Sequence, residues 1–144
     1  MASADLKKPV VLFVCTHNSS RSQMAEGLLR HLYGNAYEAC SAGTTPTGVS
    51  PFAVAVMREI GIDISEHTSE HVDAYASLPP DYVVTVCDSA REACPYVPAQ
   101  LKVIHRRFVD PRGVQGTDDE KRAVYRQVRN EIQTWLQNEF VPVT

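Results

Sequence analysis

The sequence has no hydrophobic run long enough to cross a membrane and no marked excess of charge of either sign. A membrane-spanning helix needs about 20 consecutive apolar residues, and no run approaches that length. The N-terminus also lacks a long apolar segment that ends in a small-residue cleavage site, so we expect no secretory signal. The net charge of −3, with acidic and basic residues mixed, argues against binding nucleic acid or a membrane surface through a basic patch. We therefore expect a cytoplasmic protein.

The sequence also lacks internal repeats, low-complexity tracts and an interdomain linker. A chain of 144 residues is long enough to bury a substantial core in one domain. We therefore expect a single domain over residues 1–144, present as a monomer.

A zinc site is poorly supported, because the chain has no C-x2-C pair and its five histidines show no ligand-like spacing to cysteine. A domain of this size does not need a disulfide framework, and disulfides are rare in the cytoplasm. Cysteines in such a protein are more often catalytic, redox-active, metal-binding or simply buried. The four are Cys15, Cys40, Cys87 and Cys94.

What the sequence does contain is an alternation of strand-length apolar runs with amphipathic segments. We expect strands over 9–14, 37–42, 81–87 and 101–105, and helices over 20–33, 51–60 and from 118 onward. Ser50-Pro51 and the capping box Thr117-x-x-Glu120 predict where the last two helices begin. Continuous apolar strands are typical of a parallel sheet. The predicted fold class is α/β, a four-stranded parallel sheet flanked by helices on both faces, as in a flavodoxin-like three-layer sandwich.

The segment CTHNSSRS, from Cys15 to Ser22, lies between the first expected strand and the first expected helix. The free N–H groups and the dipole of a helix N-terminus favour an anion there, and a loop can wrap its amides around a tetrahedral one. Arg21 can bind two oxygens at once. Cys15 faces the same positive field and should lose its proton easily, while Ser22 could donate a hydrogen bond to the thiolate. The loop therefore predicts a nucleophile beneath a bound oxyanion.

Each of these residues also has an ordinary structural interpretation. Cys15 alone could be an inert buried thiol and Arg21 alone a solvated helix residue, but their spacing between strand and helix favours the functional interpretation. Cys87 follows another strand, and ligands bind beyond the carboxyl ends of strands in open parallel sheets. The two thiols could therefore be neighbours in space. For Cys40 we expect a buried thiol without a partner.

CTHNSSRS fits the C-x5-R-[ST] signature of the low-molecular-weight protein tyrosine phosphatase superfamily, and Asp110-Pro111 fits its second mark. An Asp-Pro turn is common in itself, but beside the cysteine loop the resemblance implies that Asp110 is the general acid. Within the superfamily the chain most resembles the thioredoxin-coupled arsenate reductases, through SRSQMAEG, SAGT, GIDIS-x-HTSE, VVTVCDSAREACP and FVDP. Tyrosine phosphatases of this fold usually carry tyrosines directly after the Asp-Pro pair, where this chain has Arg112-Gly113.

The resemblance implies a catalytic domain that reduces arsenate to arsenite, a detoxifying reaction of arsenical resistance. Cys15 would attack arsenic while Asp110 protonates the departing hydroxyl. Cys87 would attack Cys15 and release arsenite, Cys94 would then attack Cys87, and thioredoxin would restore the dithiol without any bound cofactor. Arsenate, or phosphate or sulfate as analogues, would bind to Thr16, His17, Asn18, Ser19, Ser20 and Arg21.

Cys87 and Cys94 are seven residues apart, or about 10 Å along the axis of an intact helix. A disulfide needs Cα atoms within about 7 Å, so the segment between them must unwind or loop out for the two to bond. The intervening DSAREA is polar and sparsely apolar, which makes local unfolding cheap. A disulfide on such a segment would be easily reduced.

The chain departs from these reductases in its loop, since they usually read CTGNSCRS. His17 replaces the glycine and Ser20 the second cysteine; we expect His17 to point outward and neither change to matter much. His67 and His71 are expected in surface or cap positions. Some members bind potassium, although ordinary polar caps and turns explain the matching residues equally well. Those residues are Asn18, Glu26, Ser41 and Glu70, the last in place of an aspartate.

Three other functions stay open. A phosphatase, acting on phosphate monoesters with the same loop and acid, is the main alternative. A non-catalytic oxyanion sensor or partner-binding module is opposed by the intact set of Cys15, Arg21 and Asp110. A reductase that uses a low-molecular-weight thiol instead of thioredoxin is disfavoured, because an external thiol would make the Cys87/Cys94 pair unnecessary.

Overall fold

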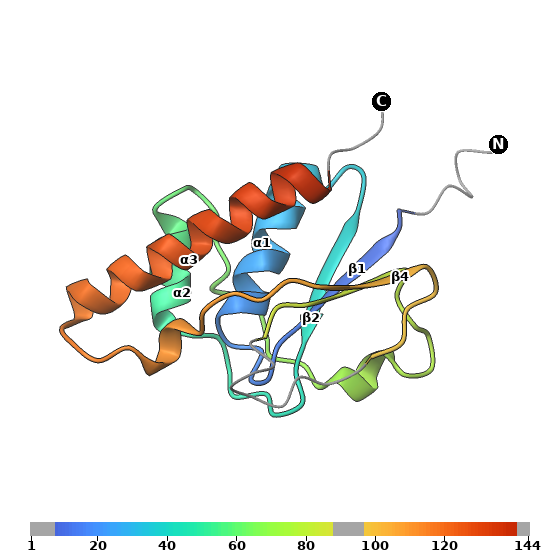
Figure 1. Ribbon diagram of the computed structural model, residues 1–144, viewed down its shortest axis with the longest axis horizontal. Helices are drawn as coiled ribbons and strands as arrows, with labels where there is room; N and C mark the ends of the chain where they lie inside the picture. The colour runs from blue at the N-terminus through green and yellow to red at the C-terminus, as the bar shows by residue number, and fades with distance from the viewer. Residues whose placement is uncertain (1–7, 88–96, 141–144) are drawn as a thin grey trace.

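The computed structural model describes residues 8–87 and 97–140, which form a parallel sheet with helices packed against it (Figure 1). The strands are β1 Val10–Val14, β2 Glu38–Ala42, β3 Tyr82–Thr85 and β4 Lys102–His105, in the order β2-β1-β3-β4. The helices are α1 Arg21–Tyr33, α2 Pro51–Arg58 and α3 Asp118–Glu139, with the short 3-10 helices η2 Val72–Tyr75 and η3 Pro111–Gly113. The predicted α/β fold with a four-stranded parallel sheet is confirmed.

Two helices begin where their capping residues predict. Ser50 Oγ accepts a hydrogen bond from the backbone N–H of Ala53 at 3.5 Å. Thr117 Oγ1 accepts one from the N–H of Glu120 at 3.2 Å, and Glu120 Oε1 accepts one from the N–H of Thr117 at 2.9 Å. These bonds involve only residues close in sequence, which is why short motifs were enough to locate them.

Both faces of the sheet are covered. Val11 and Phe13 of β1 pack in one hydrophobic cluster with buried residues of α1, α2 and α3, and Figure 1 shows these helices together on one side of the strands. Leu12 and Val14 point into a second cluster, against which η2 packs. Helices were expected on both faces; in the described residues all three α-helices lie on one face and a 3-10 helix lies on the other.

The carboxyl edge of the sheet brings two cysteines to adjacent strands. Val14 of β1 pairs with Thr85 of β3, and the N–H of Val86 donates to Val14 O at 2.9 Å. Cys15 follows β1 directly and Cys87 follows β3 after one residue, and both are buried in the same hydrophobic cluster. Cys15 and Cys87 therefore follow adjacent strands at the same edge of the sheet, and sulfur exchange between them stays a prediction. Within 8–87 and 97–140, no helix is long and apolar enough to span a bilayer.

Candidate active site

The loop from Cys15 to Arg21 has its carbonyl oxygens turned outward, toward the segment that follows β2. The backbone N–H groups of Thr45, Thr47 and Ser50 donate to the carbonyls of Thr16, His17 and Ser19, at 2.9, 3.2 and 2.9 Å. The N–H groups of His17, Ser19 and Ser20 have no acceptor in the part of the chain that the structure describes. These amides lie just before the N-terminus of α1 and can donate to an anion, as the sequence predicted.

Gly43 allows the loop to pack this closely on the end of β2. A Cβ atom at Gly43 would lie 2.5 Å from Thr16 O and 2.7 Å from Cys15 O. Both oxygens belong to the backbone, so they cannot move away from an added Cβ as the end of a flexible side chain could. Gly43 is therefore a residue of the site, although it contacts the loop only through its backbone.

Asn18 fixes the orientation of the Ser22 hydroxyl beside Cys15. It adopts a left-handed conformation with φ of 51°, which asparagine tolerates better than most residues. Its Oδ1 accepts from the N–H of Glu70 at 2.8 Å, so its Nδ2 is the donor to Ser22 Oγ, also at 2.8 Å. Ser22 Oγ lies 2.9 Å from Cys15 Sγ. Because Ser22 already accepts from Asn18, its own hydroxyl can donate to the sulfur and stabilise a thiolate.

Arg21 is buried and reaches the segment that carries Asp110. Its Nη1 donates to Phe108 O at 3.3 Å, and its Nη2 lies 3.5 Å from Asp110 Oδ2. Asp110 is also the N-cap of η3, since its Oδ1 accepts from the N–H of Arg112 at 3.0 Å. The carboxyl group is thereby held between the turn and the guanidinium, at the edge of the loop.

The side chains of Cys15, Arg21 and Asp110 all line one small pocket. Its lining consists of Cys15, His17, Ser19, Ser20, Arg21, Asp110 and Arg112. The structure thus brings together the nucleophile, the guanidinium and the carboxylic acid that the sequence predicted. It also adds Arg112, which had not been assigned to the site. His17 is half-buried and its Nδ1 contacts Arg112 Nη1, so it does not simply point outward as expected.

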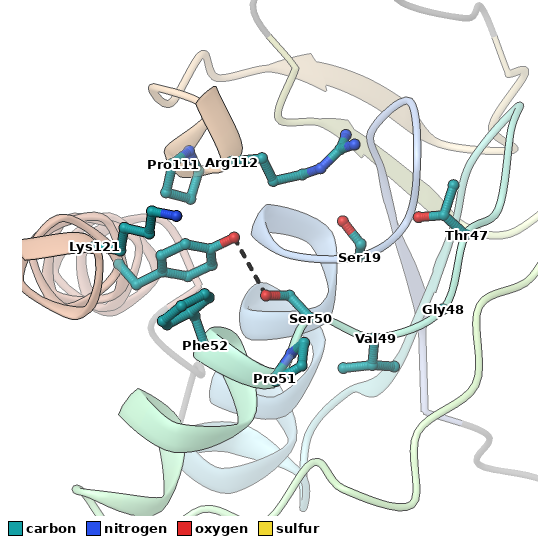
Figure 2. Close-up of a pocket in the computed structure, with 11 residues that line it drawn as sticks. Ser19, Thr47, Gly48, Val49, Ser50, Pro51, Phe52, Pro111, Arg112 and Lys121 are labelled. Carbon is teal, nitrogen blue, oxygen red and sulfur yellow. Dashed lines mark hydrogen bonds between the residues drawn. The ribbon is translucent and has the colours of Figure 1, made fainter. Parts of the chain in front are cut away.

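Tyr125 of α3 connects the loop to a neighbouring pocket. Its hydroxyl lies 3.1 Å from Ser20 Oγ and accepts a hydrogen bond from Ser50 Oγ at 3.2 Å (Figure 2). The neighbouring pocket, of about 320 Å³, extends from Ser19 to Phe52 and Lys121. Tyr125 was not among the site residues expected from the sequence, because its contact with Ser20 joins residues 105 positions apart.

A series of side-chain hydrogen bonds also supports the loop, through its contact with Asn18 O. His67 Nδ1 is 2.9 Å from Gln23 Oε1, and Gln23 Nε2 donates to Asn18 O at 3.1 Å. Arg30 Nη1, which can only donate, lies 3.0 Å from His67 Nε2. The ring is therefore neutral with its hydrogen on Nδ1, and burial lowers the pKa of His67 in agreement. The expected surface or cap position of His67 is wrong, because this residue braces the loop.

The four residues matched to a potassium site form two hydrogen-bonded pairs. Ser41 Oγ donates to Glu26 Oε1 at 2.6 Å, and Asn18 Oδ1 accepts from the N–H of Glu70. Arg30 Nη2 lies 2.6 Å from Glu26 Oε2, so the charge of that carboxylate is already matched. Potassium binding by this set stays a prediction, and no step below depends on it.

The remaining cysteines differ in their surroundings. Cys87 is bonded in a disulfide, and Cys94 lies outside the described residues. Cys15 and Cys40 are free thiols. Burial raises the pKa of Cys40 to about 11, and its Sγ donates to Val11 O at 3.5 Å. Cys40 is therefore a poor nucleophile.

Known proteins share both the sequence and the fold. The family model for low molecular weight phosphotyrosine protein phosphatase matches residues 10–140. An arsenate reductase of Halalkalibacterium halodurans is 47% identical over 127 residues, covering 88% of this chain and 91% of that protein.

Two solved structures extend the comparison. An arsenate reductase in its oxidized state superimposes with a TM-score of 0.74 at 32% identity, over 90% of this chain and 95% of that one. A thioredoxin-dependent arsenate reductase of Corynebacterium glutamicum gives a TM-score of 0.64 at 26% identity, over 95% of this chain and 65% of that one. The chain therefore belongs to the low molecular weight phosphotyrosine protein phosphatase family, and within it to the group of the arsenate reductases.

Proposed function

We propose that this protein reduces arsenate to arsenite with three cysteines and takes its electrons from thioredoxin. The observation that carries the proposal is the convergence of Cys15, Arg21 and Asp110 on one pocket, with Cys87 at the same edge of the adjacent strand. The first three groups suit attack on a tetrahedral oxyanion. The fourth supplies the second sulfur that reduction requires and hydrolysis does not.

In the first step the loop amides and Arg21 bind arsenate, and phosphate or sulfate would occupy the same place. The Cys15 thiolate, stabilised by Ser22, attacks arsenic and forms a sulfur–arsenic bond. Asp110 gives its proton to the departing oxygen, which leaves as water. Asp110 already lies beside Arg21 at 3.5 Å, so the acid reaches the oxyanion site without a large movement.

In the second step the Cys87 thiolate attacks Cys15 Sγ and the sulfur–arsenic bond breaks. The electron pair of that bond goes to arsenic, which leaves as arsenite in the +3 state, and a Cys15–Cys87 disulfide forms. Cys94 then attacks Cys87 and releases Cys15 as a thiolate. Two thiols are thus oxidised to one disulfide for each arsenate reduced, and reduction of Cys87–Cys94 closes the cycle.

Thioredoxin fits as the reductant because it exchanges dithiols for disulfides, and a relative with this fold is thioredoxin-dependent. A thiol relay of this kind needs a reducing compartment, which agrees with a cytoplasmic location. We further propose that one domain over residues 1–144 suffices for the reaction, as a monomer and without a bound cofactor. The biological role would be resistance to arsenic compounds.

The test is arsenate-dependent oxidation of NADPH in the presence of thioredoxin and thioredoxin reductase. Cys87→Ser and Cys94→Ser are each expected to stop multiple turnover, and Cys40→Ser is the matched control that keeps it. Mass spectrometry after one turnover is expected to show Cys87 linked to Cys94 with Cys15 free. Sustained turnover by Cys87→Ser would refute the relay.

A phosphatase remains the second candidate, because the loop and Asp110 would also hydrolyse a phosphate monoester. Hydrolysis of an aryl phosphate much faster than arsenate reduction, and undiminished in Cys87→Ser, would favour this function. The tyrosines that usually follow the Asp-Pro pair in such phosphatases are absent, and Arg112 stands there instead.

A further inference from the structure

Arg112 and His17 meet at the mouth of the active-site pocket, and the reaction described above uses neither side chain. Arg112 Nη1 contacts His17 Nδ1, and both residues line the pocket with Cys15 and Arg21. We propose that Arg112 is a second guanidinium that binds the substrate oxyanion, and that His17 is a positioning residue that holds it there. This inference rests on the proposed function and specifies how the same site selects its substrate.

The main chain of Arg112 is held at the edge of the pocket by the turn that it belongs to. Arg112 is in η3, directly after Asp110 and Pro111, and its N–H is bonded to Asp110 Oδ1 at 3.0 Å. The general acid and the second guanidinium therefore belong to one short turn. Figure 2 shows the Arg112 side chain stretched from this turn toward the loop that carries Ser19.

The side chain itself is exposed, and an unrestrained arginine loses much rotamer freedom when it binds a ligand. His17 removes part of that cost. An arginine can only donate, so His17 Nδ1 is the acceptor and its hydrogen is on Nε2. The main chain of His17 is itself held in place, because His17 O accepts from the N–H of Thr47 at 3.2 Å.

The negative charges of the nucleophile and the substrate favour a second guanidinium at this site. A Cys15 thiolate and a dianionic oxyanion together carry about three negative charges, and a protonated Asp110 carries none. Arg21 and the N-terminus of α1 offset about one and a half of these. A second guanidinium at the pocket mouth reduces the remaining repulsion between nucleophile and substrate, and its planar fork suits two oxygens.

The residue that follows the Asp-Pro pair also affects which substrate the site selects. The phosphatases that the chain resembles usually have tyrosine after the Asp-Pro pair, and an aromatic ring can pack against an aryl ester. Arg112 instead presents hydrogen-bond donors to oxygen atoms. It therefore favours a free oxyanion, with all its oxygens available, over a phosphate that carries an aromatic group.

The test measures the Kd of inorganic phosphate for the reduced protein by calorimetry, together with KM and kcat for arsenate. Arg112→Ala is expected to raise the phosphate Kd and the arsenate KM about 10-fold, with a much smaller change in kcat. His17→Ala should raise both about 3-fold, and the double variant should be no worse than Arg112→Ala. His17→Asn, which keeps an acceptor near the Nδ1 position, should recover most of the loss.

Lys121→Ala is the matched control, since this lysine is a cation of the neighbouring pocket and should leave both constants unchanged. Unchanged constants in Arg112→Ala would overturn the inference, as would an equal loss in Lys121→Ala. Additive losses in the double variant would overturn the positioning role of His17. A wild-type protein that binds phosphate through Arg112 but does not reduce arsenate would refute the proposed function and support this inference.

Discussion

Arg21 Nη2 lies 3.5 Å from Asp110 Oδ2, so the guanidinium that is to bind the oxyanion is already paired with the carboxyl group that is to act as the acid. An incoming oxyanion competes with Asp110 for this guanidinium. The carboxyl group of Asp110 is therefore beside the place of the oxyanion, where the proposed acid is needed.

Asp110→Asn separates these two roles. The rate of arsenite formation in a single turnover should fall about 100-fold or more, because the proton donor is lost. The phosphate Kd should stay the same or decrease, because a competing charge has been removed. Rapid-quench analysis and calorimetry measure the two quantities. Asp73→Asn, at an exposed carboxylate of η2, is the control; a parallel loss of phosphate binding in Asp110→Asn would contradict this account.

Ser22→Ala tests the hydroxyl beside the nucleophile. Without a donor at 2.9 Å from the sulfur, the Cys15 thiolate loses stabilisation. The rate of alkylation by iodoacetamide near pH 7 should fall several-fold, and Ser22→Thr should restore most of it. Peptide mapping by mass spectrometry identifies the labelled cysteine. Equal rates in the wild type and Ser22→Ala would show that the hydroxyl has no such effect.

Gly43→Ala tests the close approach of the loop to β2. The added Cβ would lie 2.5 Å from Thr16 O, so the loop or the strand must shift. We expect a loss of about 1–3 kcal/mol in the free energy of unfolding, as for other overpacked sites, with a drop in phosphate affinity. Gly113→Ala is matched to it, because nothing lies within 4 Å of the added atom. Urea unfolding checks both, and equal stabilities would contradict the packing argument.

Ionisation of Glu59 makes the free energy of unfolding depend on pH. Hydrogen bonds from Arg126, and then from Arg129, lower the pKa of Glu59 to about 2, from 4.5. A lowered pKa stabilises the folded state fully above the unfolded value, and this contribution is lost as pH falls from about 4.5 toward 2. Glu59→Gln should therefore cost about 1 kcal/mol at pH 7, since the group is partly solvated.

The difference between the wild type and Glu59→Gln should shrink as the pH is lowered through that range. Urea unfolding followed at pH 7, 4.5 and 3 measures it. Glu131→Gln, at an exposed carboxylate of α3, should show no comparable pH dependence. If the difference in unfolding free energy grew as the pH was lowered, the pKa of Glu59 would be raised in the folded state and not lowered.

Much of the fold was predictable because its signals are local. The apolar runs that became β1 and β3, and the caps at Ser50 and Thr117, depend on neighbours a few residues away. The loop was equally predictable, because a strand, five small or polar residues and an arginine at a helix start are consecutive in sequence. The partners of Arg21 and Ser20 were less accessible, since they lie 87 to 105 residues further along the chain.

The amino-acid sequence alone determined the order of strands and helices along the chain and the family, and it predicted Cys15 as the nucleophile, because these follow from contiguous residues and periodic apolar positions. Only the tertiary structure decided that His17 turns toward Arg112, that His67 braces the loop through Gln23, and that Gly43 must lack a side chain. The physical reason is that each of these depends on the packing of segments that are distant in sequence, and no short pattern encodes such contacts.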